Sequence, residues 1–244
     1  MTNNFMDKAL FIVGTGTGVG KTVVSSLLLG FLLEKGIKIS YQKWVSTGGE
    51  VPEDLLYCLE KNNLPYSGEK LETQVPFRFL MPASPHLAAE REGRQVDPEL
   101  IKTVFFQSIQ ENDLLLVEGV GGVMVPLRRD LLLCDFLAEF QMPVLIVARS
   151  GLGTINHTLL TIEALRQRKI PLLGVVFSDE EAGMDVDDPL VADNLRTIGE
   201  IGRVAVFGRL RRNAEYGILK KEFALIGERI LQKISDGGAK SSSC

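Results

Sequence analysis

Histidine, cysteine and tryptophan are scarce in this chain of 244 residues, which contains two histidines, three cysteines and one tryptophan. The cysteines, Cys58, Cys134 and Cys244, show no metal-binding spacing, and their odd number fits a reducing compartment better than a disulfide framework. Two histidines are too few for a histidine-rich metal centre. The composition therefore argues against a zinc-dependent or disulfide-stabilised scaffold.

Long apolar runs and an excess of positive charge are also missing. No apolar run reaches the roughly 18 residues that cross a bilayer, and the segment MTNNFMDK lacks the basic and apolar regions of a secretory signal. A formal net charge of −4 argues against nucleic acid or an anionic membrane as the main partner. We therefore expect a cytoplasmic protein that acts on small molecules.

Apolar runs alternate with helix-like segments along the chain. The runs fit buried parallel strands and cover residues 11–13, 37–43, 114–119, 144–149, 172–177 and 203–208. Helical patterns cover 97–110, with Asp97 as N-cap, and also 154–168 and 218–234. This alternation predicts one α/β domain over residues 1–236, a doubly wound, mostly parallel sheet with helices on both faces. Residues 237–244 are expected to form a flexible tail.

The segment 9–36 follows the order of a nucleotide-binding P-loop: an apolar strand, the turn GTGTGVGKT, and an apolar-periodic helix that ends at Gly36. Backbone N–H groups of such a loop bind phosphate, Lys21 adds a charge at the β- and γ-phosphates, and Thr22 offers a hydroxyl to Mg²⁺. The loop is one residue longer than the usual pattern, because its first glycine is Gly14 and position 15 is threonine. A glycine-rich turn that binds nothing is the alternative.

Polar residues follow the predicted strands at the edge where open α/β sheets bind their ligands. Lys43 ends the second strand and suits a phosphoryl-transfer site, or else is a solvated lysine. Glu118 ends the strand 114–119, where P-loop proteins place a carboxylate for Mg²⁺; a helix cap or ion pair is the alternative. Asp54 is a further candidate metal ligand. The alternative is an acidic residue in the first turn of a helix, where the helix dipole favours a negative charge without any metal.

Glycines precede two further segments at this edge. Gly119, Gly121 and Gly122 follow Glu118 and allow the backbone to approach a ligand closely. The segment GLGTINHTLL, residues 151–160, places glycines before a helix, whose free N–H groups attract an anion such as a carboxylate. Thr154 or Asn156 fits the N-cap of that helix, and capping alone would explain Thr154.

Taken in order, these motifs resemble the dethiobiotin synthetase family. The resemblance spans residues 9 to about 178 and rests on GTGTGVGKT, YQKWVSTG, Asp54, SPH, VEGVGGVMVPL and GLGTINH. The longer P-loop is itself a trait of that family. The resemblance implies a P-loop NTPase-like fold and an ATP-dependent ligase of biotin biosynthesis. Such an enzyme carboxylates 7,8-diaminopelargonic acid with CO₂, phosphorylates the carbamate with ATP, and closes the ureido ring.

The resemblance also assigns roles to individual residues. Lys21, Lys43 and Thr17 would be catalytic, and Thr22, Asp54 and Glu118 would hold Mg²⁺. The nucleotide would bind Gly16, Thr17, Gly18, Val19, Gly20, Lys21, Thr22 and Glu118. The diamine would bind Lys43, Thr47, Gly121, Gly122 and Asn156, the last from the neighbouring subunit of a homodimer.

The chain departs from the family pattern at several positions. Gly16 and Gly18 stand where family members often carry acidic residues, and Trp44 replaces a common proline. Ser178 stands where an asparagine often contacts the nucleobase, and Phe207 replaces another common proline. The choice of nucleobase is therefore left open.

A partition-type P-loop ATPase, which acts as a nucleotide switch without a small-molecule substrate, is the main alternative. That group usually carries an additional lysine early in its P-loop. The residues between Gly14 and Gly20 are Thr, Gly, Thr, Gly and Val, with no lysine. The P-loop composition thus favours the synthetase.

Overall fold

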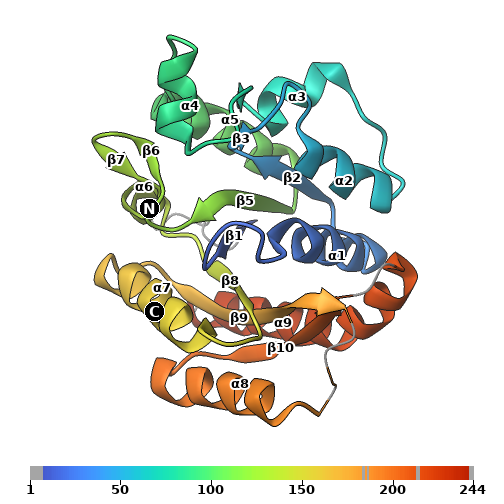
Figure 1. Ribbon diagram of the computed structural model, residues 1–244. Helices are drawn as coiled ribbons and strands as arrows, with labels where there is room; N and C mark the ends of the chain where they lie inside the picture. The colour runs from blue at the N-terminus through green and yellow to red at the C-terminus, as the bar shows by residue number, and fades with distance from the viewer. Residues whose placement is uncertain (1–7, 183–184, 186, 213–214, 242–244) are drawn as a thin grey trace.

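A six-stranded sheet forms the centre of the computed structural model, which describes residues 8–182, 185, 187–212 and 215–241. Its strands lie in the order β10-β9-β8-β1-β5-β2, and all neighbouring pairs are parallel (Figure 1). These strands are β1 (Ala9–Gly14), β2 (Ile39–Lys43), β5 (Leu114–Gly122), β8 (Val144–Arg149), β9 (Leu172–Ala182) and β10 (Val206–Arg212). The prediction of a parallel sheet from the six apolar runs is confirmed.

Helices cover both faces of this sheet, and each face has its own apolar core. One core contains residues of α1 (Lys21–Glu34), α2 (Glu53–Lys61) and α9 (Tyr216–Ser241). The other contains residues of α5 (Pro98–Glu111), α6 (Leu133–Phe140), α7 (Thr154–Gln167) and α8 (Pro189–Gly202). Successive side chains of a strand point to opposite faces, so Leu10 and Ile12 enter the first core, whereas Phe11 and Val13 enter the second.

Shorter elements complete the rim of the sheet. They are β3 (Val45–Thr47) paired with β4 (Phe77–Phe79), the hairpin of β6 (Pro126–Arg128) and β7 (Leu131–Leu132), α3 (Gly68–Gln74) and α4 (Pro85–Arg91). Within the described ranges, no helix combines the length and the apolar character that crossing a membrane requires.

The predicted helices are present, and one is longer than expected. Asp97 caps α5 by accepting a hydrogen bond from the N–H of Glu99, and Pro98 opens that helix. The last helix, α9, ends at Ser241, beyond the predicted helical pattern of 218–234. That residues 237–244 are flexible stays a prediction, and residues 242–244 lie outside the described part. Adding residues to a helix that has already formed costs little, because each new residue adds a backbone hydrogen bond. This gain outweighs the low helix propensity of the two glycines near the end of α9.

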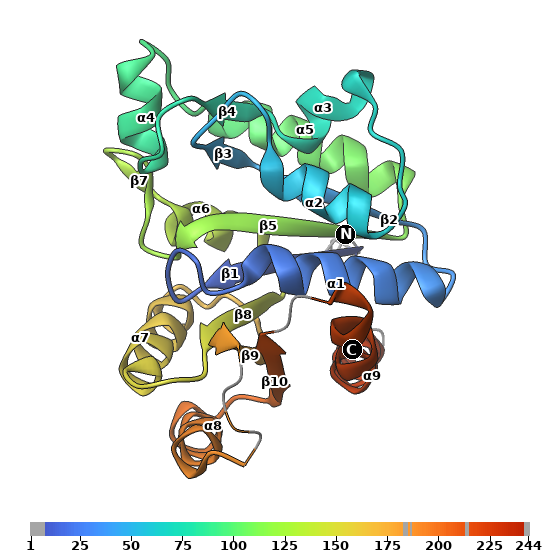
Figure 2. The ribbon, with the colours of Figure 1, turned by 45° about the vertical axis from the view of Figure 1, so that its right-hand side comes forward.

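Helix α1 lies on one face of the sheet with α9 beside it (Figure 2). Its residues Leu28, Leu29 and Leu32 are almost completely buried. On the α9 side, the Tyr216 hydroxyl lies 2.8 Å from Ser26 Oγ, and the Phe31 ring packs against the backbone of Gly227. A helix that is apolar on all sides must be covered on all sides, and α9 supplies the last cover of α1.

Candidate active site

The P-loop joins β1 to α1 at the carboxyl edge of the sheet. Lys21, the first residue of α1, folds back over the loop, and its Nζ donates a hydrogen bond to the Gly16 carbonyl at 2.9 Å. A side chain at Gly14 would lie 2.7 Å from that carbonyl oxygen and 2.9 Å from Lys21 Nζ. The glycine is therefore needed at position 14, where the loop and the lysine close over the backbone.

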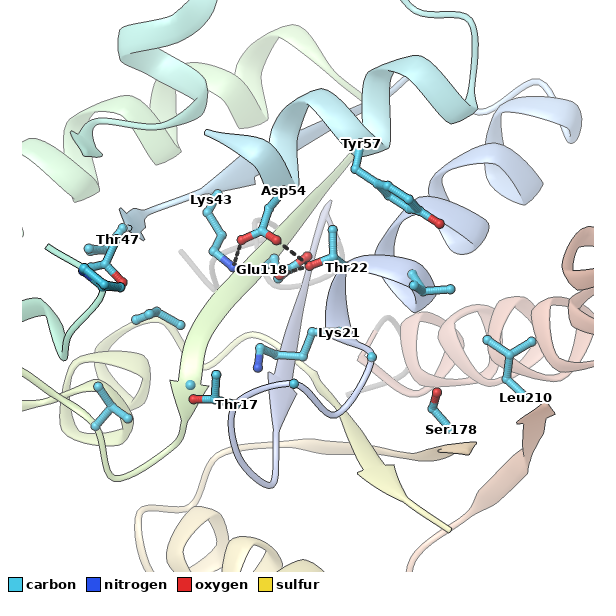
Figure 3. Close-up of a pocket in the computed structure, with 18 of the residues that line it drawn as sticks. Thr17, Lys21, Thr22, Lys43, Thr47, Asp54, Tyr57, Glu118, Ser178 and Leu210 are labelled. Carbon is cyan, nitrogen blue, oxygen red and sulfur yellow. Dashed lines mark hydrogen bonds and ion pairs between the residues drawn. The ribbon is translucent and has the colours of Figure 1, made fainter. Parts of the chain in front are cut away.

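Four polar side chains converge next to this loop. Thr22 Oγ1 donates to Asp54 Oδ1 at 2.6 Å and to Glu118 Oε1 at 3.0 Å. Lys43 Nζ lies 2.6 Å from Asp54 Oδ2 and 2.7 Å from Glu118 Oε1. The parallel register of β2 and β5 sets Lys43 opposite Glu118, which is why two residues 75 positions apart meet. The three predicted metal ligands are thus brought together around one lysine (Figure 3).

Burial and charge shift the pKa values of this cluster in different directions. Burial, with a smaller contribution from Lys43, lowers the pKa of Lys21 to about 8. Burial also acts to lower the pKa of Lys43, but the carboxylates of Glu118 and Asp54 outweigh it, so this pKa is raised. For Asp54, the effect of burial is outweighed by Lys43, and its pKa is lowered. Lys43 and Asp54 therefore form a charged pair, whereas Lys21 is poised to gain from an anionic ligand.

A pocket of about 1060 Å³ runs across the edge of the sheet and includes this cluster. Figure 3 shows Thr47 at one side of the cluster and Ser178 and Leu210 at the other. The lining near Thr47 comes from residues of β3, of the segment 82–85 and of the end of β5, namely Val45, Pro82, Ala83, Ser84, Pro85, Val120, Gly121 and Val125. The opposite end is lined by Tyr57, Ser178, Asp179, Leu210, Arg211, Arg212 and Leu219. A pocket of this volume is large for one small ligand, and the charged cluster lies between its two ends.

Most of the residues predicted from the sequence line this pocket. They are Thr17, Gly18, Gly20, Lys21, Thr22, Lys43, Thr47, Asp54, Glu118 and Gly121. Gly16 contributes its carbonyl to Lys21, and Gly122 packs against the backbone of Gly14 and Gly16. Val19 differs, because its side chain is buried in the core against α1, so only its backbone is available to a phosphate.

Asn156 lies away from the pocket. It is an exposed residue of α7 and lines a second hollow, of about 630 Å³, together with Ile155, Leu159, Leu160 and Ile201. Within one chain, Asn156 is therefore not part of the charged site. Its role in the site of a neighbouring subunit stays a prediction.

Sequence reasoning missed two contributors to the site. The buried Tyr41 donates its hydroxyl to Glu118 Oε2 at 3.0 Å, and its position two residues before Lys43 on the same strand was the available signal. Asp179 is buried behind Ser178 and pairs with Arg209 at 2.8 Å. No spacing in the sequence indicated the Asp179–Arg209 pair, because the two residues come together only through the pairing of β9 with β10.

The departures from the family pattern have structural roles. Trp44 points away from Lys43 into the opposite core, where its ring lies 4.9 Å from that of Phe11 and 5.4 Å from that of Phe136. Phe207 is buried on the other face. Ser178 packs against the P-loop, because a side chain at Gly20 would lie 2.7 Å from its Oγ. A small residue at position 178 thus fits close packing against the loop.

The sheet order, the P-loop and the charged cluster at the strand ends define a P-loop NTPase-like α/β protein. Among solved structures, the cell division ATPase MinD of Pyrococcus furiosus is similar, with a TM-score of 0.57 and 15% identity over 93% of this chain and 99% of that one. The ParA protein of pNOB8, solved on nonspecific DNA, has a TM-score of 0.57 at 14% identity over 94% of this chain and 99% of its own. At such identities the likeness concerns the fold alone.

Sequence relatives are far more similar. The ATP-dependent dethiobiotin synthetase BioD of Methanococcus vannielii is 37% identical over 87% of this chain and 98% of its own length. The BioD of Rhodopseudomonas palustris strain BisB5 is 41% identical over 86% of this chain and 89% of its own. A protein-family model described as an AAA domain matches residues 8–217. The chain belongs to the ATP-dependent dethiobiotin synthetase family.

Proposed function

We propose that this protein is an ATP-dependent carbon–nitrogen ligase that converts 7,8-diaminopelargonic acid, CO₂ and ATP into dethiobiotin, ADP and phosphate. The observation that carries the proposal is the meeting of Lys21, Thr22, Lys43, Asp54 and Glu118 in one pocket. The reaction is inferred from membership of the family, and the lysines, carboxylates and hydroxyl of this cluster are groups that suit that reaction.

The chemistry has three steps, and each needs positive charge or close positioning. One amine of the substrate attacks CO₂ and loses a proton, which gives a carbamate. The carbamate oxygen takes the γ-phosphoryl group of ATP, and ADP leaves. The second amine then attacks the carbamoyl carbon, phosphate leaves, and the five-membered ureido ring closes. Because the second step joins two anions, fixed cations must offset their repulsion, and holding the second amine near the carbon accelerates the third.

The residues take their roles from their places in the pocket. Backbone N–H groups of residues 16–20 and the side chains of Thr17 and Lys21 would hold the phosphates. Lys43 lies between the P-loop and Thr47, so its ammonium would serve the carbamate and the transferred phosphoryl group. Thr47, Gly121 and Gly122 would form the binding site for the diamine. Glu118 would act next to the nucleotide as well as at the metal.

The site fits Mg²⁺ as the metal. Thr22, Asp54 and Glu118 present one hydroxyl and two carboxylates within hydrogen-bonding reach of each other, and hard oxygen ligands are those that Mg²⁺ prefers. Three protein oxygens leave room for phosphate oxygens and water, which Mg²⁺ normally retains in nucleotide sites. Bound there, the ion would offset the charge of the phosphates as a Lewis acid.

We further infer a homodimer in the cytoplasm. Leu160 of α7 and Ile201 of α8 line the second hollow with exposed fractions of 60% and 65%, and Leu152, just before α7, is 89% exposed. A second copy of the chain would cover this surface. Asn156, at the start of α7, would then reach the partner's pocket and bind the carboxylate tail of the diamine.

Phosphate release from a mixture of protein, Mg-ATP, bicarbonate and diaminopelargonate tests the proposal. The ligase requires the diamine for phosphate release and forms dethiobiotin, which mass spectrometry identifies. Lys102→Ala, which removes a surface lysine of α5 bonded to Glu99 at 2.8 Å, is a control that should retain activity. Hydrolysis that does not depend on the diamine, with no product, would favour the partition-type ATPase switch.

A further inference from the structure

The carboxylate oxygens of Asp54 and Glu118 are all engaged within the protein. Asp54 Oδ1 accepts from Thr22, and Asp54 Oδ2 pairs with Lys43. Glu118 Oε1 accepts from both Thr22 and Lys43, and Glu118 Oε2 accepts from Tyr41. A divalent cation that takes these carboxylates as ligands would lie next to the Lys43 ammonium, which is 2.6 Å from Asp54 Oδ2 and 2.7 Å from Glu118 Oε1. Repulsion between the two cations therefore favours the departure of one of the present donors.

Lys43 is the donor best able to leave. The Tyr41 hydroxyl is enclosed in the core and bonds the far oxygen of Glu118. The Thr22 hydroxyl is itself a metal ligand through its lone pairs, so it gains by staying. Lys43 carries a positive charge that a metal cation repels, and its four-carbon stem allows the ammonium to swing away from fixed neighbours.

We propose that Lys43 is an internal counter-ion that exchanges with the divalent cation. In the metal-free site, its ammonium pairs with two carboxylates and offsets part of their charge; one of them, Glu118, is only 1% exposed. When the cation and the nucleotide bind, Lys43 gives up both carboxylates and turns its charge toward the carbamate. This inference rests on the proposed function for the identity of that anion, whereas the exchange itself concerns only the protein and the metal.

The exchange orders the events at the site. Before the metal is present, Lys43 is held by two strong partners and is not available to the substrate. Afterwards the carboxylates are satisfied by the metal, and the lysine becomes an unpaired cation at the point where two anions must meet. One side chain thus protects the buried carboxylates in the free protein and assists the reaction in the loaded one.

Binding of Mn²⁺ to the nucleotide-free protein, followed by electron paramagnetic resonance of the free ion, tests the exchange. Lys43→Met removes the charge and keeps a similar stem. We expect it to bind Mn²⁺ at least about tenfold more tightly than the wild type, because a competing charge in direct contact with both ligands is lost. Lys43→Arg keeps the charge and should bind Mn²⁺ about as weakly as the wild type.

Lys102→Met is the matched control, since Lys102 Nζ also lies between two carboxylates, at 2.8 Å from Glu99 and 2.8 Å from Glu139, but on the surface of α5. Its Mn²⁺ affinity should equal that of the wild type. Equal or weaker Mn²⁺ binding by folded Lys43→Met would overturn the proposal. Because neither ATP nor diamine is present, this result is independent of whether the protein forms dethiobiotin.

A measurement on the wild type covers the case in which Lys43→Met does not fold. The side-chain ¹⁵N resonance of Lys43, assigned by its disappearance in Lys43→Arg, should shift as Mg²⁺ is added without nucleotide. The resonance of Lys102 should stay in place. A Lys43 resonance that is unchanged at saturating Mg²⁺ would show that the lysine keeps its partners, and the exchange would be ruled out.

Discussion

The two halves of the sheet edge use charge in opposite ways. On the β1–β5–β2 half, Lys21, Lys43, Asp54 and Glu118 face the centre of the pocket. On the β8–β9–β10 half, Asp179 is bound by Arg209 at 2.8 and 3.0 Å, and Arg211 is paired with Glu222 of α9. Charges of the first half form a cluster that a ligand can rearrange, whereas those of the second half fix the wall of the pocket.

The strongest test of this contrast is Arg209→Met on the second half. It leaves Asp179, which is 5% exposed, without its cation. Removing one partner of a buried pair costs about 3–5 kcal/mol, so urea unfolding should show a loss of that size. Mg²⁺ should not restore the stability, because Asp179 is outside the metal cluster. Arg209→Lys should recover part of the lost stability. If Arg209→Met lowers the free energy of unfolding by less than about 1 kcal/mol, the Arg209–Asp179 pair contributes no more than an ordinary surface ion pair.

On the first half, Lys43→Ala should affect turnover instead. We expect diamine-dependent phosphate release to fall by roughly 10²-fold or more, the scale of losing one preorganised charge at a reacting centre. Steady-state assays at saturating Mg-ATP measure it, with Lys102→Ala as control. A decrease of only a few-fold would remove Lys43 from the chemistry.

Glu118→Gln sharpens the comparison further by separating metal binding from packing. The amide oxygen can still accept the Tyr41 hydroxyl, but the charge is lost. The Mg²⁺ concentration at half-maximal activity should rise by roughly tenfold, the range found when support for a metal ligand is removed. The check is a titration of activity against Mg²⁺ at fixed ATP, and a curve that coincides with that of the wild type would count against metal ligation.

The smallest expected effect is a pH dependence at Lys21. Its pKa is lowered to about 8, first by burial and then by Lys43, so the cation is lost as the pH rises through that value. Bound phosphates favour the charged form, and ATP binding should therefore take up about half a proton at pH 8 and about 0.1 at pH 7. Calorimetry in buffers of different ionisation enthalpy measures this uptake. Lys21→Met should abolish it, and equal uptake at both pH values would contradict the assignment.

Local patterns predicted the first half of the edge well. The P-loop, Lys43 and Glu118 are each specified within a few residues of sequence, and the parallel strands bring them together. Lys43 ends β2 as predicted, whereas β5 continues past Glu118 to Gly122. The position of Tyr41 could have been predicted in the same way, because residues two apart on a strand point to the same face and Tyr41 precedes Lys43 by two.

Local sequence patterns predicted few of the residues on the β8–β9–β10 half of the sheet edge. Asp179 and Arg209 are 30 residues apart and meet only through the pairing of β9 with β10. Tyr57 and Leu219 come to the same wall from α2 and α9, which no spacing in the sequence connects.

The packing of α1 against α9 has a consequence for biosynthesis. One side of the P-loop helix is covered by α9, where Tyr216 meets Ser26 and Gly227 meets the Phe31 ring, and Tyr216 is made 190 residues after Ser26. While the ribosome adds the intervening residues, that apolar side has no native partner, and exposed apolar surface of this kind is what chaperones bind. The packing of the P-loop helix is therefore complete only after α9, 190 residues further along the chain, has been translated.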